Sequence, residues 1–263
     1  MKRLDKKPNL EKHYIISYSN VLHRYDFMTK CIFPLIALFF VVEANAQFGI
    51  RLSTQQNDYS NWNTIVSSAV SPANNNIFGS SYEIGVDYWF RLKNVRLEFY
   101  PEVGLGYSQS SNSNSGSEAF PSSYKLKKVF GGINAHLYFL DLKNDCMCPT
   151  FSKQNDFIKK GLFLILSSKA HFQNKETLFP IDIIKNNDLA IEVAAGLGLD
   201  IGISDLITVS PFGMVSYFPS SEWDGISINH GIVHVLPPDE TTSNIAFKVG
   251  VRIGFRPDYL TNR

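Results

Sequence analysis

The strongest constraint on the fold is a strict alternation in residues 82–92, YEIGVDYWFRL. Every second residue from Tyr82 to Leu92 is apolar, and the residues between them include Glu83, Asp87 and Arg91. A period of two places the apolar side chains on one face of a β-strand. That face meets a protein core in a soluble sheet and meets lipid in an outer-membrane barrel. What this face contacts therefore decides the function classes that remain open.

The same alternation recurs along the chain. Together with residues 82–92, the other segments make eight predicted strands. The clear ones are residues 95–107, 189–203 and 245–256, and the weaker ones are residues 48–53, 128–141, 161–172 and 207–218.

Three features favour lipid over a soluble core. The clear strands have ten or more residues, which suits a tilted membrane-spanning strand better than the usual globular strand of about 5 to 6 residues. Their polar faces combine charges with repeated glycines, as the crowded interior of a narrow barrel requires. Tight turns near residues 92–94 and 204–205 alternate with long polar connections. The long connections are predicted at residues 54–81, 109–123, 173–188 and 219–243.

We therefore predict an all-β chain that folds as an eight-stranded antiparallel transmembrane β-barrel. The four long connections then lie at the external end, and both ends of the barrel domain lie in the periplasm. One connection departs from this pattern, because residues 142–160 are long where a short periplasmic turn is expected.

An export signal precedes the barrel. Residues 31–42 are the apolar maximum of the chain, too short for the roughly 20 residues of a membrane-spanning helix. Lys30 precedes this segment, and an Ala-x-Ala pattern ends at Ala46, as in a signal peptide. A buried core helix is the alternative, but no other segment looks helical enough to pack against it. We predict an upstream extension at residues 1–27, a signal peptide at residues 28–46 and the barrel domain at residues 47–263.

The alternating pattern from QFGIRL to KVGVRIGFR resembles the small outer-membrane β-barrel proteins of Bacteroidota, including the PorT-like group. The resemblance implies a location in the outer membrane of a Gram-negative bacterium. PorT-like membership implies a role in secretion or assembly. The chain departs from the common barrel ending, because PDYLTNR follows the last predicted strand and displaces the terminal aromatic residue inward.

Charged residues of both signs lie on the predicted inner faces. An eight-stranded barrel is filled by its own side chains, and buried charges require partners, so we expect ion pairs that plug the interior. A polar pore or a proton-transfer site is the alternative. The predicted interior charges are Arg51, Glu83, Asp87, Arg91, Arg96, Glu98, Glu102, Lys128, Lys169, Glu192, Asp200, Lys248, Arg252 and Arg256.

Two histidines, His136 and His171, are also predicted to face inward from neighbouring strands. An acid–base site would bring them within hydrogen-bond reach of each other or of a nucleophile. Counting residues from the periplasmic end places them about 15 Å apart in depth, at roughly 3.3 Å per residue. We therefore expect no catalytic pair.

Two cysteines, Cys146 and Cys148, remain after export, in the long connection at residues 142–160. Disulfides persist in an oxidising compartment, so the pair is a candidate periplasmic disulfide, with free or intermolecular thiols as alternatives. Two thiols are too few for a cysteine metal cage, and the sequence predicts no metal and no cofactor.

Composition narrows the partners. With 25 basic and 24 acidic residues, the chain has no charge excess to attract nucleic acid. We expect outer-membrane lipid as a partner, with surface or periplasmic proteins as further candidates. The predicted function is a non-enzymatic structural or interaction role. The alternatives are a PorT-like secretion or assembly component, a membrane-embedded acyltransferase or hydrolase, and a soluble periplasmic barrel that holds a ligand against an inward apolar face.

Overall fold

The computed structural model divides the chain into two units, Met1–Asn45 and Ala46–Arg263. The residues it describes all belong to the second unit. The predicted extension and signal peptide, Arg256, and the two thiols Cys146 and Cys148 therefore lie outside the described residues. The described ranges are 47–69, 77–92, 95–111, 123–140, 161–179, 183–204, 206–223 and 241–255.

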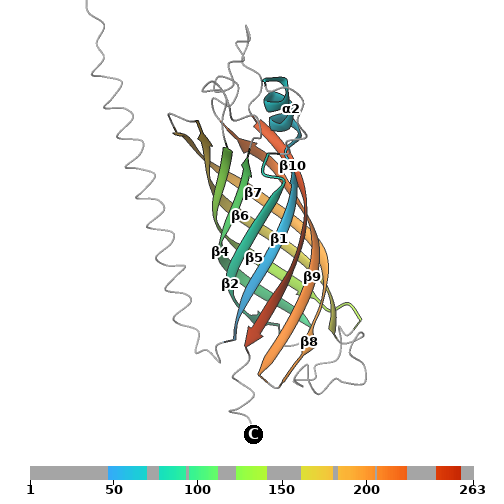
Figure 1. The fold of residues 1–263 in the computed structure, drawn as a ribbon. Coiled ribbons are helices and arrows are strands. Elements are labelled where there is room, and N and C mark those ends of the chain that lie inside the picture. Colours follow the sequence, from blue (N-terminus) through green and yellow to red (C-terminus); the bar gives the residue numbers. More distant parts are fainter. Residues whose placement is uncertain are drawn as a thin grey trace, which may run out of the picture. The chain divides into compact units, whose positions relative to one another are not determined.

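The described residues form a closed antiparallel β-barrel of eight long strands, which confirms the predicted fold class (Figure 1). The long strands are β1 (Phe48–Asp58), β2 (Ser80–Tyr88), β4 (Leu97–Ser111), β5 (Ser123–Leu137), β6 (Leu162–Leu178), β7 (Ile183–Leu199), β9 (Ile207–Glu222) and β10 (Thr241–Phe255). Each pairs with the next, and β10 pairs with β1 to close the barrel. Two short strands, β3 (Phe90–Arg91) and β8 (Ile201–Gly202), continue β2 and β7 in the same register.

The barrel has two distinct ends. Phe48 of β1 pairs with Phe255 of β10, and their rings stack with centroids 5.3 Å apart. We call this the termini end. The helix α2 (Ser60–Ala69) follows β1 at the opposite end, which we call the helix end (Figure 1). No helix in the described part of the chain is long and apolar enough to cross a membrane.

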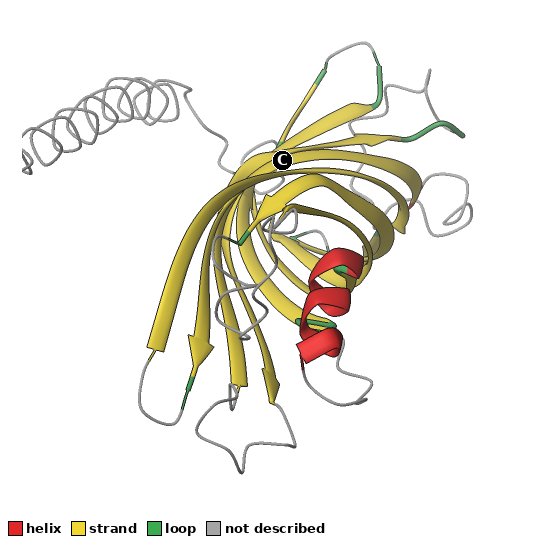
Figure 2. Cartoon of the chain, turned by 90° about the horizontal axis from the view of Figure 1, so that it is seen from above, coloured by secondary structure: helices red, strands yellow, loops and turns green. Residues whose placement is uncertain are grey.

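The apolar faces of the strands point outward. Tyr82 and Val103 are each 65% exposed, whereas Glu83 between Tyr82 and Ile84 is only 6% exposed. The barrel therefore has an apolar outer wall around a polar interior. Figure 2 views the ring of strands from above. The alternative of a soluble barrel with an inward apolar face is wrong, because the side chains it needs inside lie on the outer surface.

Strands are longer than the sequence pattern predicted, and the predicted loops are correspondingly shorter. Residues 173–188 were expected to be a loop, yet β6 continues to Leu178 and β7 begins at Ile183. Outward residues such as Asn174 and Asn187 are polar here, so the apolar alternation ends although the backbone pairing continues. Residues 54–81 also differ from the expected loop, because they include the end of β1 and the helix α2.

Inward glycines make room for large side chains inside the barrel. A Cβ on Gly104 would collide with the Ile84 carbonyl oxygen and the Phe130 ring. A Cβ on Gly198 would collide with the Phe163 ring. These glycines therefore explain the repeated Gly on the polar faces: they sit where a narrow barrel has no volume left for a second side chain.

Candidate functional site

The interior charges predicted from the sequence lie together in the barrel core. Twelve of the fourteen are buried: Arg51, Glu83, Asp87, Arg96, Glu98, Glu102, Lys128, Lys169, Glu192, Asp200, Lys248 and Arg252. The side chain of Arg91 and the whole of Arg256 lie outside what the structure describes. The strand pairing brings these charges into a series of clusters along the barrel.

Asp87 and Arg252 form an ion pair with three hydrogen bonds. Arg252 donates from Nε to both carboxylate oxygens at 3.0 and 2.9 Å, and from Nη2 to Oδ1 at 2.6 Å. The same guanidinium lies over the Tyr100 ring, 4.5 Å from its centroid. A charge-assisted fork of this kind fixes the arginine in one orientation.

Glu102 lies nearer the middle of the barrel. Lys169 reaches its Oε2 at 2.9 Å, Asn134 donates to the same oxygen at 2.6 Å, and the Arg51 Nε lies 3.7 Å away. Arg51 also lies over the Phe212 ring, with 4.7 Å between the guanidinium carbon and the ring centroid. One buried carboxylate thus balances two cations.

Glu83 and Glu192 share Lys248. The Lys248 ammonium lies 2.9 Å from Glu83 and 2.8 Å from Glu192. Lys128 adds a second cation to Glu83 at 3.0 Å, and Ser216 donates to Glu192 at 2.6 Å. Three strands distant in sequence, β2, β7 and β10, are joined through this one ammonium group.

A carboxylate surrounded by aromatic residues lies toward the termini end. Glu98 accepts hydrogen bonds from Trp89 Nε1 at 2.6 Å, Tyr100 at 2.5 Å and Tyr138 at 3.1 Å. Tyr138 is also 2.6 Å from Asp200. By alternation Trp89 shares the face of Asp87, Tyr100 that of Glu98 and Tyr138 that of His136, although β5 itself ends at Leu137.

The two inward histidines lie far apart. His136 pairs with Ile165, and His171 pairs with Phe130, six positions away along the same two strands. Six residues span roughly 20 Å at about 3.3 Å per residue, a separation that agrees with the expectation that they do not meet.

Both histidines are buried among interior side chains. His136 is buried between the rings of Phe163 and Tyr100, with centroids 4.2 and 4.1 Å away. His171 Nε2 lies 2.6 Å from Glu192 in the shared cluster, where it is fully buried. Both rings are packed into the interior, out of reach of a substrate outside the barrel.

The helix end is closed by a cluster of apolar side chains that we call the aromatic cap. Trp62 from α2 meets Trp223 edge to face, with centroids 5.4 Å apart, and Trp223 stacks on Phe78 at 5.5 Å. Lys175, buried below, lies 4.7 Å from the Trp62 ring and 3.1 Å from Asp188. The cap consists of Tyr59, Trp62, Ile65, Ile77, Phe78, Tyr124, Leu126 and Trp223.

The sequence pattern did not place α2 and Phe78 in this cap or Lys175 below it. Its residues come from four separate segments, and Phe78 takes φ of 58°, a left-handed conformation that is rare for a bulky residue. Asn57 supports this turn by donating to the Phe78 carbonyl at 2.9 Å. Burial raises the pKa of the Tyr59 phenol, and nearby Glu83 raises it further, so Tyr59 stays neutral in the cap. The aromatic residues in and beside the predicted long connections, such as Trp62 and Trp223, were the sequence signal for this cluster.

The interior is therefore built for ion pairing. No group of three or more His, Cys, Asp or Glu side chains among the described residues is arranged to hold a metal ion. Carboxylates and cations alternate from the termini end to the aromatic cap, and large rings fill the space between them.

Comparisons with known proteins concern the fold. No family model matches the chain, and no curated protein matches it, so nothing in them supports the resemblance to Bacteroidota or PorT-like proteins. Neisserial surface protein A shares 9% identity with a TM-score of 0.41, covering 81% of this chain and 97% of that one.

Two further structures are similar to the chain at the same low level. Ail of Yersinia pestis, in complex with the heparin analogue sucrose octasulfate, shares 8% identity with a TM-score of 0.42, over 80% of this chain and 99% of that one. The outer-membrane protease OmpT of Escherichia coli shares 9% identity with a TM-score of 0.34, over 80% and 96%. The fold assigned to this chain rests on its own strand pairing.

Proposed function

We propose that this chain is an outer-membrane β-barrel of a Gram-negative bacterium with a structural or interaction role and no enzymatic activity. The observation that carries the proposal is the arrangement of the barrel wall, which is apolar outside and ion-paired inside. In water such an outer wall would be a large exposed apolar surface, which drives association. In a bilayer the apolar wall contacts hydrocarbon instead of water. A closed barrel also pairs the backbone groups that an open sheet would leave unpaired at its edges.

The packed interior argues against a diffusion pore. Eight strands enclose a space that side chains fill, and in this barrel the Glu83, Glu192 and Lys248 cluster crosses that space. The reconstituted protein is therefore expected to show no steady conductance in planar bilayers. A stable open channel in the purified barrel would overturn this part of the proposal.

Membrane insertion is tested by fractionation. The full chain is expressed in a Gram-negative host, and the outer membrane is separated. The migration of the protein in detergent gels is then compared with and without heating. A folded barrel is expected in the outer-membrane fraction, with a compact band that shifts on heating. A soluble protein whose migration does not depend on heating would contradict the proposal.

The narrower reading, a PorT-like secretion or assembly component, is supported by the sequence pattern alone. Cross-linking in cells tests it, since a secretion partner that is captured by the wild-type protein and identified by mass spectrometry would favour it. The enzymatic alternative is tested by assaying acyl transfer and lipid or peptide hydrolysis. Turnover that His136→Gln or His171→Gln abolishes in a folded barrel would replace the non-enzymatic role.

A further inference from the structure

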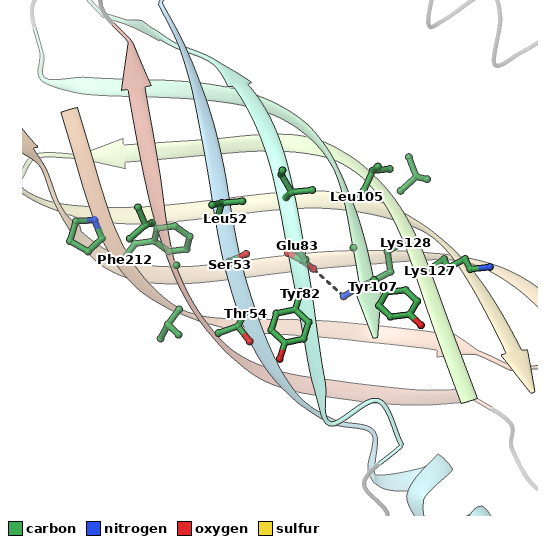
Figure 3. Close-up of a pocket in the computed structure, with 17 residues that line it drawn as sticks. Leu52, Ser53, Thr54, Tyr82, Glu83, Leu105, Tyr107, Lys127, Lys128 and Phe212 are labelled. Carbon is green, nitrogen blue, oxygen red and sulfur yellow. Dashed lines mark hydrogen bonds and ion pairs between the residues drawn. The ribbon is translucent and has the colours of Figure 1, made fainter. Parts of the chain in front are cut away.

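The outer wall carries a groove on the face formed by β9, β10, β1, β2, β4 and β5. Its volume is about 1100 Å³ (Figure 3). Its floor is one row of paired positions, Gly250, Ser53, Glu83, Gly106 and Lys128. These residues face inward, and two of them are glycines, so the floor of the groove is largely bare backbone. We call this groove the outer trough.

Two rows of outward side chains flank the outer trough, and they differ in character. The row nearer the termini end is wholly apolar and consists of Val251, Leu52, Ile84, Leu105 and Val129. The row nearer the helix end carries hydroxyl groups and a cation and consists of Val249, Thr54, Tyr82, Tyr107 and Lys127. Tyrosines are typical where a barrel wall passes from hydrocarbon to headgroups. The outer trough thus follows the boundary between apolar and polar wall.

A cluster of lysines lies at the β5 end of the outer trough. Lys127 is 3.0 Å from Glu176, and Lys185 is 3.7 Å from the same carboxylate. Lys125 pairs directly with Glu176 across the strands. The Lys127 and Lys185 side chains are 55% and 60% exposed, so three cations surround one carboxylate on the outer wall and leave a positive excess.

We propose that the outer trough binds one phosphate-bearing lipid of the leaflet at the helix end. An acyl tail packs against the apolar row of the outer trough, and the phosphate contacts Lys127 and Lys125. The inference rests on the proposed membrane insertion and adds the lipid class. Charge complementarity selects the occupant, because the excess positive charge stands beside the headgroup-level tyrosines and attracts an anionic headgroup.

The outer trough is a single line across the strands. From Pro211 and Phe212 of β9 to β5 it crosses five strand spacings of about 4.8 Å, or roughly 24 Å. Figure 3 shows Thr54, Tyr82 and Tyr107 on successive strands, with Lys127 beyond Tyr107, so the row of hydroxyl groups leads to the cation.

The test measures lipid retained by the full chain. The folded barrel is equilibrated with micelles holding equal amounts of dimyristoyl phosphatidylglycerol and dimyristoyl phosphatidylcholine, and the bound lipids are counted by native mass spectrometry. The wild-type protein is expected to retain one phosphatidylglycerol in preference to phosphatidylcholine. Lys125→Gln/Lys127→Gln is expected to lose the preference, by roughly fivefold for each lysine. Glu176→Gln is expected to strengthen it, and Lys125→Arg/Lys127→Arg to keep it.

A second pair of variants tests the tail contact. Leu105→Trp fills the outer trough and is expected to reduce retention of both lipids. Val215→Trp adds the same bulk to the outer face of β9, outside the trough lining, and is expected to leave retention unchanged.

Failure of this inference is distinguishable from failure of the proposed function. A chain that shows no heat-modifiable band overturns membrane insertion itself. A folded, inserted barrel in which Lys125→Gln/Lys127→Gln keeps the wild-type lipid preference overturns the lipid site alone. A dimer that buries Leu105 and retains no lipid would also overturn it, and would assign the outer trough to a second copy of the chain.

Discussion

Buried charges in this barrel are held by specific partners. Asp87 is held by Arg252 through three short hydrogen bonds in the interior, where water does not compensate a lost cation. Removing one member of a buried pair costs far more than the pair contributes in net stability, because the other charge stays buried.

Arg252→Met is therefore expected to reduce the free energy of unfolding by about 3–5 kcal/mol. The double variant Arg252→Met/Asp87→Leu is expected to recover most of the loss, because no charge is left without a partner. Unfolding by urea in lipid vesicles measures both. Lys185→Met, which removes a half-exposed cation, is the control, with an expected change below about 1 kcal/mol. Equal losses in Arg252→Met and Lys185→Met would contradict the buried pair.

Steric crowding at inward glycines is a second effect of single residues. Gly104→Ala places a methyl group against the Ile84 carbonyl and the Phe130 ring, and overpacking of this kind costs about 1–3 kcal/mol. Gly213→Ala is the matched control on β9, since a Cβ there meets nothing within 4 Å. The same unfolding measurement compares them. A Gly104→Ala barrel as stable as the Gly213→Ala barrel would show that the interior has spare volume.

The strands form two zones along their length. In the apolar zone, outward residues such as Val251 and Ile84 form the wall that we propose contacts lipid, while beyond it outward residues such as Asn174 and Asn187 are polar. A strand of 17 residues exceeds the roughly 9–11 needed to cross the membrane. The remaining length extends the barrel past the apolar wall toward the helix end.

Val251→Arg is expected to impair insertion, because a cation on the lipid face is costly, by about 2–4 kcal/mol at the midplane and by less toward the headgroups. Asn187→Arg places the same side chain on the outer wall of β7, in the polar zone, and is expected to insert normally. Outer-membrane yield and the heat-modifiable band report the result. Normal yield of Val251→Arg would mean that this face of β10 does not meet lipid.

The molecule as a whole has a definite polarity. The connection between β5 and β6 includes Cys146 and Cys148 and joins strand ends at the termini end, whereas α2 lies at the helix end (Figure 1). If the termini end faces the periplasm, a reagent outside the cell reaches the helix end and does not reach the termini end.

We predict that Cys146 and Cys148 are protected in intact cells from a membrane-impermeant thiol reagent. They are expected to react after the outer membrane is permeabilised and the thiols are reduced. Asn61→Cys in a Cys146→Ser/Cys148→Ser background places one thiol in α2 and is expected to react in intact cells. Labelling in the reverse order would invert the orientation.

The sequence by itself determined the strand faces, the number of strands and most of the buried charges. A period of two is a local property of the backbone, so alternation alone separates Glu83 from Tyr82 and Ile84. Twelve predicted charges are buried for this reason. The long strands also predicted a closed barrel, because a wall apolar on one face and charged on the other is stable in a bilayer only when it closes.

Only the tertiary structure decided which groups meet. Lys248 contacts Glu83 and Glu192 because register and closure bring β2, β7 and β10 around one space, and no local pattern encodes that meeting. The strand extensions beyond the apolar wall were not predictable, because polar outward residues remove the alternation while the hydrogen-bonded pairing persists. The aromatic cap depends on contacts between segments distant in sequence, among them Trp62 and Trp223. Such contacts form only when the barrel closes and brings distant segments together, and the hydrophobic periodicity of a single strand does not predict them.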